Sequence, residues 1–146
     1  MADAIPALPT HLTLEIVTPD RSVVAEKVDE VEIPGAEGYF GVRPGHTPLL
    51  AVLRVGELWY RKGSETYYLS IAFGFAEVLP DRVTILAELA ERADEIDVAR
   101  AEASKRRAEE RIAKPSTEID SERARIALAK SLVRLQVSTR ARTRVN

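Results

Sequence analysis

Hydrophobic and polar residues alternate through the first part of the chain, from about residue 11 to residue 89. Residues 12–16 read LTLEI and residues 83–89 read VTILAEL. A period of two is typical of half-buried β-strands. Several short strands separated by turn-forming residues predict an antiparallel β-sandwich or barrel rather than a parallel sheet. The turn signals fall at 19–20, 34–35, 44–45, 56, 62–64 and 80–81.

The pattern changes near residue 93, where helix-forming residues replace the alternation. From Asp94 onward the chain has no glycine and one proline, and alanine, glutamate, arginine and lysine dominate. This composition favours α-helix, and Pro115 is expected to divide it into helices near 95–113 and 120–138. The connection is short, so the two helices should be antiparallel neighbours.

The predicted hairpin offers little apolar surface, because its first helix presents small residues to larger ones on the second. Small side chains against large ones let two helix axes approach closely. Apolar burial contributes only about 25 cal/mol per Å², so such a pair should be stable only when docked on the sandwich or on a partner. The chain is therefore predicted to be α+β, with a sandwich in residues 1–92 and a hairpin in residues 93–146. The two stripes are Ala101, Ser104, Ala108 and Ile112, and Ala124, Leu128, Leu132 and Leu135.

Charge is distributed unevenly, although the formal net charge is only −2. Residues 1–92 have 8 Lys and Arg against 14 Asp and Glu, residues 93–120 have 6 against 8, and residues 121–146 have 7 against 1. The last segment indicates either a contact surface for an acidic partner or a solvated basic helix. Acidic partners include nucleic acid, anionic lipid, nucleotide phosphates and a carboxylate-rich protein face. The last segment has no aromatic residue, which is unfavourable for binding single-stranded nucleic acid.

Composition excludes several kinds of chemistry. The 146 residues contain no cysteine and two histidines, His11 and His46, which excludes disulfides, thiolate metal sites and a histidine metal cluster. No apolar run approaches the ~20 residues of a membrane-spanning helix, and the start has no signal or transit pattern, so a cytoplasmic protein is expected. The phosphate-loop, dinucleotide-binding, zinc-protease and serine-hydrolase motifs do not occur.

The segment 38–50, GYFGVRPGHTPLL, combines three glycines, two prolines and His46. Its glycines recur every three residues with Gly35, but a strand-like apolar run follows instead of a helix, so a phosphate cradle is not favoured. A small hydrolase with His46 as its base is one alternative, although no acid or nucleophile lies nearby in sequence. We expect tight turns at the rim of the sandwich, with His46 as a turn or interface residue.

The pattern IDxxRA occurs twice, at 96–101 and 119–124. Each aspartate stands at or near a helix start, where its carboxylate can cap free N–H groups and complement the helix dipole. Basic residues also share one face of each helix, Arg100, Arg107 and Arg111 on the first and Lys130 and Arg134 on the second. In an antiparallel hairpin these faces could converge on a triphosphate, or they could be solvated.

The chain resembles the epsilon subunit of bacterial F-type ATP synthase over residues 11–138. Three segments carry the resemblance, namely residues 38–50, AELAERADEIDVARAE at 87–102 and RRAEERI at 106–112. It implies an antiparallel sandwich of about ten strands followed by a helical hairpin, in a non-catalytic rotor subunit of the central stalk. The sandwich would bind the gamma subunit and the c-ring and couple ion flow to ATP synthesis. The hairpin would extend into the catalytic head of alpha and beta subunits and inhibit ATP hydrolysis.

The resemblance also implies that the folded hairpin binds ATP as a regulatory ligand, with no required cofactor and no metal. Lys130 departs from an expected arginine and supplies charge without the bidentate fork. Tyr39 stands where some members have an acidic residue facing the c-ring, so an apolar, stacking contact is expected there. The candidate interface residues are Tyr39, Phe40, Arg43 and His46. The ATP-site positions of the family fall on Glu91, Ile96, Asp97, Arg100, Ala101, Arg107, Lys130 and Arg134.

The same resemblance implies a location on the cytoplasmic side of the bacterial plasma membrane, with attachment only through the complex and no nucleic-acid partner. The basic residues from Arg123 to Arg144 would face acidic residues of the beta subunits when the hairpin is extended. The alternative from the residues alone is a free-standing nucleotide-sensing or nucleic-acid-binding module that uses the basic tail.

Overall fold

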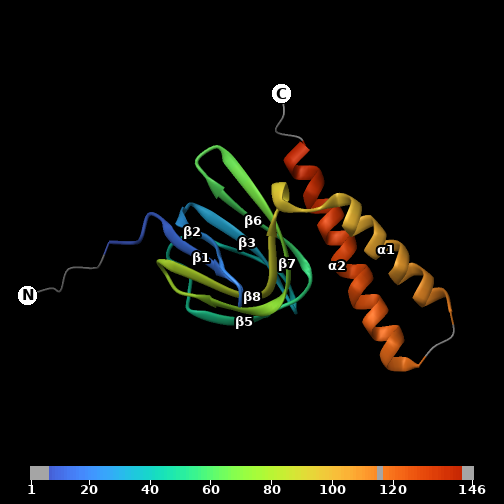
Figure 1. The fold of residues 1–146 in the computed structure, drawn as a ribbon. Helices are drawn as coiled ribbons and strands as arrows, with labels where there is room; N and C mark the ends of the chain where they lie inside the picture. The colour runs from blue at the N-terminus through green and yellow to red at the C-terminus, as the bar shows by residue number, and fades with distance from the viewer. Residues whose placement is uncertain (1–6, 115–116, 143–146) are drawn as a thin grey trace, which may run out of the picture.

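The structure is a computed structural model that describes residues 7–114 and 117–142. Within these residues, eight strands are followed by a short 3-10 helix and two α-helices (Figure 1). Pro115 and Arg144, on which two expectations rest, lie outside the described residues. The bounds are β1 Leu12–Val17, β2 Ser22–Val28, β3 Glu30–Gly35, β4 Gly38–Val42, β5 Leu49–Leu53, β6 Gly56–Lys62, β7 Glu65–Val78, β8 Arg82–Arg92, η1 Ala93–Glu95, α1 Val98–Ala113 and α2 Glu118–Arg142.

The strands form two layers that are joined through the two longest strands. In hydrogen-bonded order the sheet runs β2-β1-β8-β7-β5-β3-β4, and β6 pairs with β3 and β7. The first half of β7 pairs with β6 and its second half with β5, while β8 pairs with β1 only through residues 82–86. The expected count of about ten strands is therefore wrong among the described residues, because β7 and β8 each serve both layers as one continuous strand.

β7 changes layer at a backbone kink formed by Phe73 and Gly74. The pairing of β7 with β8 skips Phe73, and the φ angles are 60° at Phe73 and 124° at Gly74. Both values lie in a region that residues with a Cβ atom rarely adopt. A Cβ atom at Gly74 would lie 2.0 Å from the carbonyl oxygen of Leu86, so only glycine fits there. The kink at these two residues lies where the pairing of β7 passes from β6 to β5.

One strand pair departs from the expected antiparallel arrangement. β1 and β8 are parallel, with Leu14 opposite Val83 and Ile16 opposite Ile85. A parallel pair needs a long connection, which the other six strands of the sandwich supply here. The sheet is consequently mixed, with the first strand placed beside the last.

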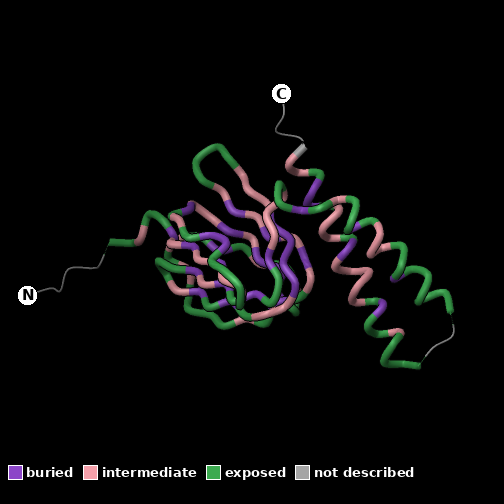
Figure 2. Tube along the Cα trace, viewed as in Figure 1, coloured by how far each residue is buried: buried purple, intermediate pink, exposed green. Residues whose placement is uncertain are grey.

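The hydrophobic core lies between the two layers, and strands such as β1 and β6 contribute every second residue to it, whereas β7 buries residues 69–72 in a row (Figure 2). In β1, Leu12, Leu14 and Ile16 are fully buried while the residues between them are partly exposed. The sequence alternation thus predicts the inward face correctly. Other large, fully buried side chains are Val24, Val28, Ile33, Leu58, Tyr60, Leu69, Ile71 and Ile85.

α2 lies between α1 and the sandwich, where it contacts β6, β7 and η1 (Figure 1). The helices expected near 95–113 and 120–138 are found at 98–113 and 118–142. Within the described residues, neither helix has an apolar stretch long enough to cross a bilayer.

The two helices meet through small residues on both sides of their seam. Leu132, which was expected in this seam, is 46% exposed, so its predicted place there is wrong, whereas Leu128 and Leu135 are partly buried. The reason is that α2 has to cover the sandwich as well as α1, and the sandwich fixes how the helix is rotated. The buried seam residues repeat every seven positions and are Ala101 and Ala108 on α1 and Ala124, Ser131 and Ser138 on α2.

Candidate functional site

The junction between sandwich and hairpin is held by charged side chains. Arg92, the last residue of β8, donates hydrogen bonds at 3.2 Å to the Tyr60 hydroxyl and to a backbone carbonyl of β2. Glu95 accepts two hydrogen bonds from Arg21, at 3.3 and 2.7 Å. The Arg21 guanidinium holds the pKa of Glu95 below its ordinary value. Because Ile96 is also buried, any pivot of the hairpin lies beyond that residue.

The first IDxxRA motif starts α1 and mostly serves helix initiation. The Asp97 carboxylate caps the helix by accepting a hydrogen bond of 3.0 Å from the Arg100 backbone N–H. Ile96 is buried beside the sandwich and Ala101 is fully buried in the helix seam. Only the Arg100 side chain, which is exposed, is left unexplained by helix formation.

Glu91 and Arg134 are the two candidate nucleotide-binding residues that the structure brings into contact. The Arg134 Nε atom lies 2.7 Å from one Glu91 carboxylate oxygen, and a terminal guanidinium nitrogen donates a hydrogen bond of 3.2 Å to the other. The Arg134 Nε atom is buried, and it has no well-aligned hydrogen-bond acceptor within the described part of the chain. The two side chains nevertheless form a close, charge-assisted pair between α2 and β8.

The remaining candidate basic residues are apart from this pair. The Lys130 ammonium lies 5.6 Å from the centre of the Phe73 ring, where β7 is kinked. Arg107 is exposed and donates a hydrogen bond of 3.0 Å to the Ser104 hydroxyl one turn earlier on α1. The second helix thus turns its candidate cations toward the sandwich, while the first keeps Arg100 and Arg107 at the surface.

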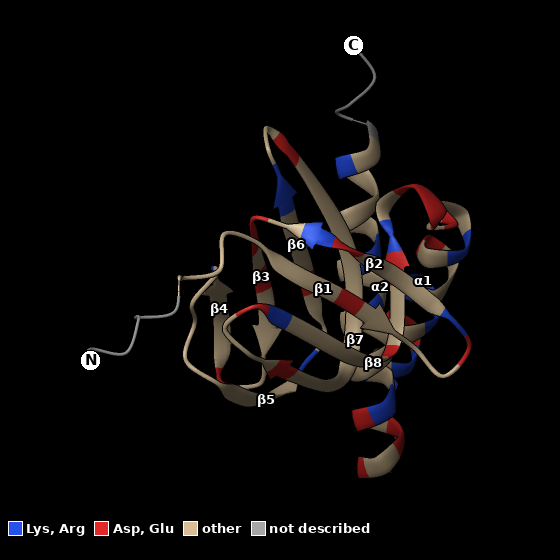
Figure 3. Cartoon of the chain, turned by 90° about the vertical axis from the view of Figure 1, so that its left-hand side faces the viewer, with Lys and Arg blue, Asp and Glu red and all other residues tan. Residues whose placement is uncertain are grey.

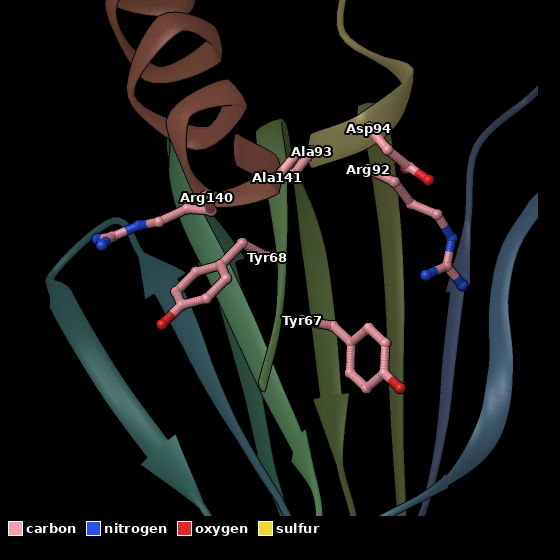
Figure 4. Close-up of a pocket in the computed structure, with 7 residues that line it drawn as sticks. All are labelled: Tyr67, Tyr68, Arg92, Ala93, Asp94, Arg140 and Ala141. Carbon is pink, nitrogen blue, oxygen red and sulfur yellow. The ribbon is translucent and has the colours of Figure 1, made fainter. Parts of the chain in front are cut away.

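Sequence reasoning missed Arg140, which contacts the sandwich near the end of α2. Its Nε and one terminal nitrogen each donate a hydrogen bond of 3.2 Å to the two carboxylate oxygens of Glu57, and its guanidinium carbon lies 4.7 Å from the centre of the Tyr68 ring. Arg140 also lines a pocket of about 320 Å³ across which Arg92 lies (Figure 4). The only sequence signal was the position of Arg140 three residues after the buried Val137, on the docked side of the helix.

The turn segment 38–50 divides into core and surface residues. Phe40 is partly buried and packs against the core, whereas Tyr39 is 47% exposed. The Arg43 side chain is exposed and pairs with Glu30 at 3.0 Å. His46 donates from Nδ1 to the Thr47 carbonyl at 2.6 Å. Tyr39, Arg43 and His46 therefore present surface, and Phe40 supports the strand from inside.

An apolar row crosses the outer face of three neighbouring strands. Val52 of β5 is opposite Phe75 of β7, which is opposite Leu86 of β8, and directly opposed residues share one face of a sheet. These side chains are 55%, 60% and 54% exposed. The row ends at Val17 of β1, and β5 has no charged residue, as the uniform tan of that strand in Figure 3 indicates. An exposed apolar row of this kind marks an interaction surface.

A sandwich with an uncovered apolar face and a hairpin docked through charged side chains is the construction of a subunit that binds neighbours. Residues 11–93 match the family described as the β-sandwich domain of the ATP synthase delta/epsilon chain, and residues 94–139 match the long α-helix domain of the same chain. The chain belongs to the family of ATP synthase epsilon chains, which are non-catalytic subunits in the central stalk of F-type ATP synthase.

Similar proteins agree with this assignment. The chain is 51% identical over 131 residues to ATP synthase epsilon chain 2 of Syntrophotalea carbinolica, covering 88% of this chain and 94% of the relative. It is 48% identical over 126 residues to the epsilon chain of Nitratidesulfovibrio vulgaris, covering 86% and 94%.

Two solved structures share the fold. A chain of the Euglena gracilis mitochondrial ATP synthase, in a structure of OSCP, F1 and the c-ring, aligns with a TM-score of 0.79 and 23% identity over 97% of this chain and 87% of that one. A chain of the Tetrahymena thermophila mitochondrial ATP synthase, in a structure of the central stalk and c-ring, has a TM-score of 0.60 and 15% identity, covering 92% and 98%. The hydrolase alternative does not fit a non-catalytic family.

Proposed function

We propose that this chain joins the gamma subunit to the c-ring and so couples ion flow to ATP synthesis, while its hairpin restrains ATP hydrolysis. The complex would sit on the cytoplasmic side of the bacterial plasma membrane, and the chain would reach the membrane only through its partners. The observation that carries the proposal is the apolar row Val52, Phe75 and Leu86 on a face that the hairpin leaves uncovered.

The apolar row is proposed as the gamma contact because its side chains are more than half exposed on a rigid sheet. Burying such a row on a partner yields roughly 25 cal/mol per Å². Phe75→Glu should therefore prevent the chain from co-purifying with gamma when the subunits are co-expressed. Leu132→Glu is the matched control, since Leu132 is exposed on α2 away from the row. Co-purification of Phe75→Glu at the wild-type level would refute this contact.

The turn segment is proposed as the c-ring contact, through Tyr39, Arg43 and His46. Tyr39 offers an exposed aromatic face that is braced by Arg54, whose guanidinium carbon lies 4.8 Å from the ring centre. In support, both solved structures of similar fold come from assemblies that include a c-ring. Tyr39→Ala should lower the ratio of ion pumping to ATP hydrolysis in the assembled enzyme. Glu37→Gln, in the same turn, is the control, and equal ratios in both variants would contradict the assignment.

The hairpin is proposed as a brake on hydrolysis because few contacts hold it on the sandwich. A switch requires two packings that differ by only a few kcal/mol, and charge pairs supply weaker docking than an apolar core does. Removal of the hairpin after Ile96 keeps the Arg21 to Glu95 pair that fixes the junction. The truncated subunit should assemble normally and raise ATP hydrolysis by the enzyme. Hydrolysis no faster than that of the intact enzyme would rule out the brake.

ATP is proposed as a regulatory ligand of the docked hairpin, bound near Glu91 and Arg134. Arg134 already forms a close ion pair with the Glu91 carboxylate in the docked hairpin, and guanidinium groups also bind phosphate oxygens strongly. Lys130 and Arg100 would contribute further positive charge from the two helices. Calorimetry should detect ATP binding that Arg100→Ala weakens at least about tenfold, as expected for the loss of a charge-assisted hydrogen bond.

Arg106→Ala provides the control for that titration, because Arg106 is also exposed on α1 but lies outside the IDxxRA motif. It should bind ATP like the wild type. Equal ATP affinity of the wild type and Arg100→Ala would remove Arg100 from the site.

A further inference from the structure

The connection between β5 and β6 touches both the turn segment and the hairpin. Residues 54–57 follow the end of β5 at Leu53 and include the first residues of β6. This short segment, which we name the 54–57 connection, contacts Tyr39 on one side and is contacted by α2 residues on the other. Tyr39 of the proposed c-ring surface and Arg140 of the hairpin both contact this connection.

Tyr39 is fixed by both ends of the 54–57 connection. Its hydroxyl accepts a hydrogen bond of 3.1 Å from the Glu57 backbone N–H, and its ring lies under the Arg54 guanidinium at 4.8 Å. Gly56 leaves room for this arrangement, because a Cβ atom there would lie 2.7 Å from the Tyr39 hydroxyl and 2.6 Å from Pro34 Cβ. The exposed tyrosine therefore depends on where the connection lies.

α2 reaches the same connection by one direct contact and by one contact through Phe73. Arg140 donates two hydrogen bonds to the Glu57 carboxylate, whose side chain is only 12% exposed. Lys130 lies on the ring of Phe73, and the Phe73 backbone N–H donates a hydrogen bond of 3.4 Å to the Arg54 carbonyl. Glu57 is therefore in direct contact with α2, and Arg54 is linked to α2 through Phe73.

We propose that Glu57 couples hairpin docking to Tyr39, with Arg140 as the positioning residue that holds Glu57 when α2 lies on the sandwich. Loss of the Arg140 contact exposes a nearly buried carboxylate and removes one restraint on the residue whose N–H fixes the tyrosine hydroxyl, while the pairing of Glu57 with Ser70 keeps its backbone in β6. The coupling is reciprocal. A partner that displaces Tyr39 weakens hairpin docking, and release of the hairpin weakens the contacts that hold Tyr39 by the same factor. The regulatory meaning of this coupling rests on the proposed function, but the coupling itself belongs to the isolated chain.

The test uses the full-length chain and its lack of cysteine. Val137→Cys places one thiol at a fully buried position on the docked side of α2, and its labelling rate with a maleimide reports undocking. Ser131→Cys, at a 2% exposed position in the helix seam, reports separation of the two helices instead. Tyr39→Phe removes only the hydroxyl, Arg140→Gln removes the positive charge that pairs with the Glu57 carboxylate, and the fluorescence of Trp59 verifies folding.

Tyr39→Phe should raise the Val137→Cys labelling rate about threefold in the wild-type background and leave it unchanged in the Arg140→Gln background, the non-additivity expected of coupled residues. Arg140→Lys keeps the charge but loses the fork, so it should restore part of the Tyr39→Phe effect. In the Arg134→Gln background the Tyr39→Phe effect should persist, because Arg134 pairs with Glu91 and not with the connection.

Equal effects of Tyr39→Phe in the wild-type and Arg140→Gln backgrounds, or no effect in either, would overturn the coupling. A rise in Ser131→Cys labelling that matches the rise at Val137 would also overturn it, because the helices would then be separating together with any undocking. Failure of the hydrolysis brake is tested separately by truncation of the assembled enzyme, so the two results can be told apart.

Discussion

The sandwich and the docking face of the hairpin are held together by different forces. The sandwich has one continuous apolar core between its layers, with members such as Ile16, Tyr60 and Ile85 fully buried. The docking face of the hairpin carries the buried Val137 together with two ion pairs to the sandwich, Arg134 with Glu91 and Arg140 with Glu57. Apolar burial is insensitive to salt, whereas exposed and partly exposed ion pairs are screened by it.

This difference predicts that the hairpin can undock without unfolding the sandwich. Arg92 and Glu95 fix the chain to the sandwich just before α1 begins. Movement of the helices should therefore not be transmitted to the strands through the junction. We therefore expect the sandwich to behave as a rigid platform and the hairpin as a separable part, joined by the short segment that Arg92 and Glu95 hold.

Ile85→Ala should destabilise the sandwich most. Ile85 is fully buried in the core, and truncation of such a residue to alanine costs about 2–5 kcal/mol. Denaturant unfolding followed by circular dichroism of the β-structure should show this loss. Val137→Ala on α2 is the comparison, since Val137 is equally buried but belongs to the docked hairpin. A similar loss of global stability in both variants would contradict the separation of the two regions.

Arg134→Gln should weaken docking of the hairpin without affecting the sandwich. The variant loses a charge-assisted pair with Glu91, which is worth about 1–2 kcal/mol, so labelling of Val137→Cys should accelerate roughly tenfold. Arg123→Gln, at an exposed position of α2, should leave the labelling rate unchanged. If both variants labelled at the wild-type rate, the pair with Glu91 would not be holding the helix.

Arg21→Gln should change the acid sensitivity of the junction. The hydrogen bond from Arg21 lowers the pKa of Glu95 from its ordinary value of 4.5, so the pair stabilises the folded junction above that pH and is lost as pH falls through the folded-state pKa. Wild type and variant should differ in hydrogen exchange of η1 at pH 7 and converge in acid. A difference that persists unchanged in acid would mean that Glu95 ionisation is not the cause.

Much of the fold follows from local pattern. The alternation in 12–16 and 83–89 places strands and their buried faces correctly, and Asp97 marks the start of the first helix to within two residues of the expected position. The kink at Phe73 and Gly74 was not predictable. It depends on the close approach of the Gly74 backbone to the Leu86 carbonyl of another strand. The seam between the helices was also missed, since its rotation depends on the sandwich beneath α2.

The candidate site was predictable only in part for the same reason. The family resemblance directs attention to Glu91 and Arg134, and the structure places them in contact across 43 residues of sequence. Arg140 and Glu57 are 83 residues apart, and no motif joins them. Their pairing depends on the packing of α2 against β6, which the sequence pattern does not predict.

The most direct test of the account is native-state hydrogen exchange of the full-length chain at low and high salt. The account predicts that α2 amides open with a free energy well below that of β7 and β8, and that added salt lowers the α2 value while leaving the strand values unchanged. Opening free energies that are equal for α2 and β7 at both salt concentrations would show that the hairpin is an inseparable part of the sandwich and contradict the account.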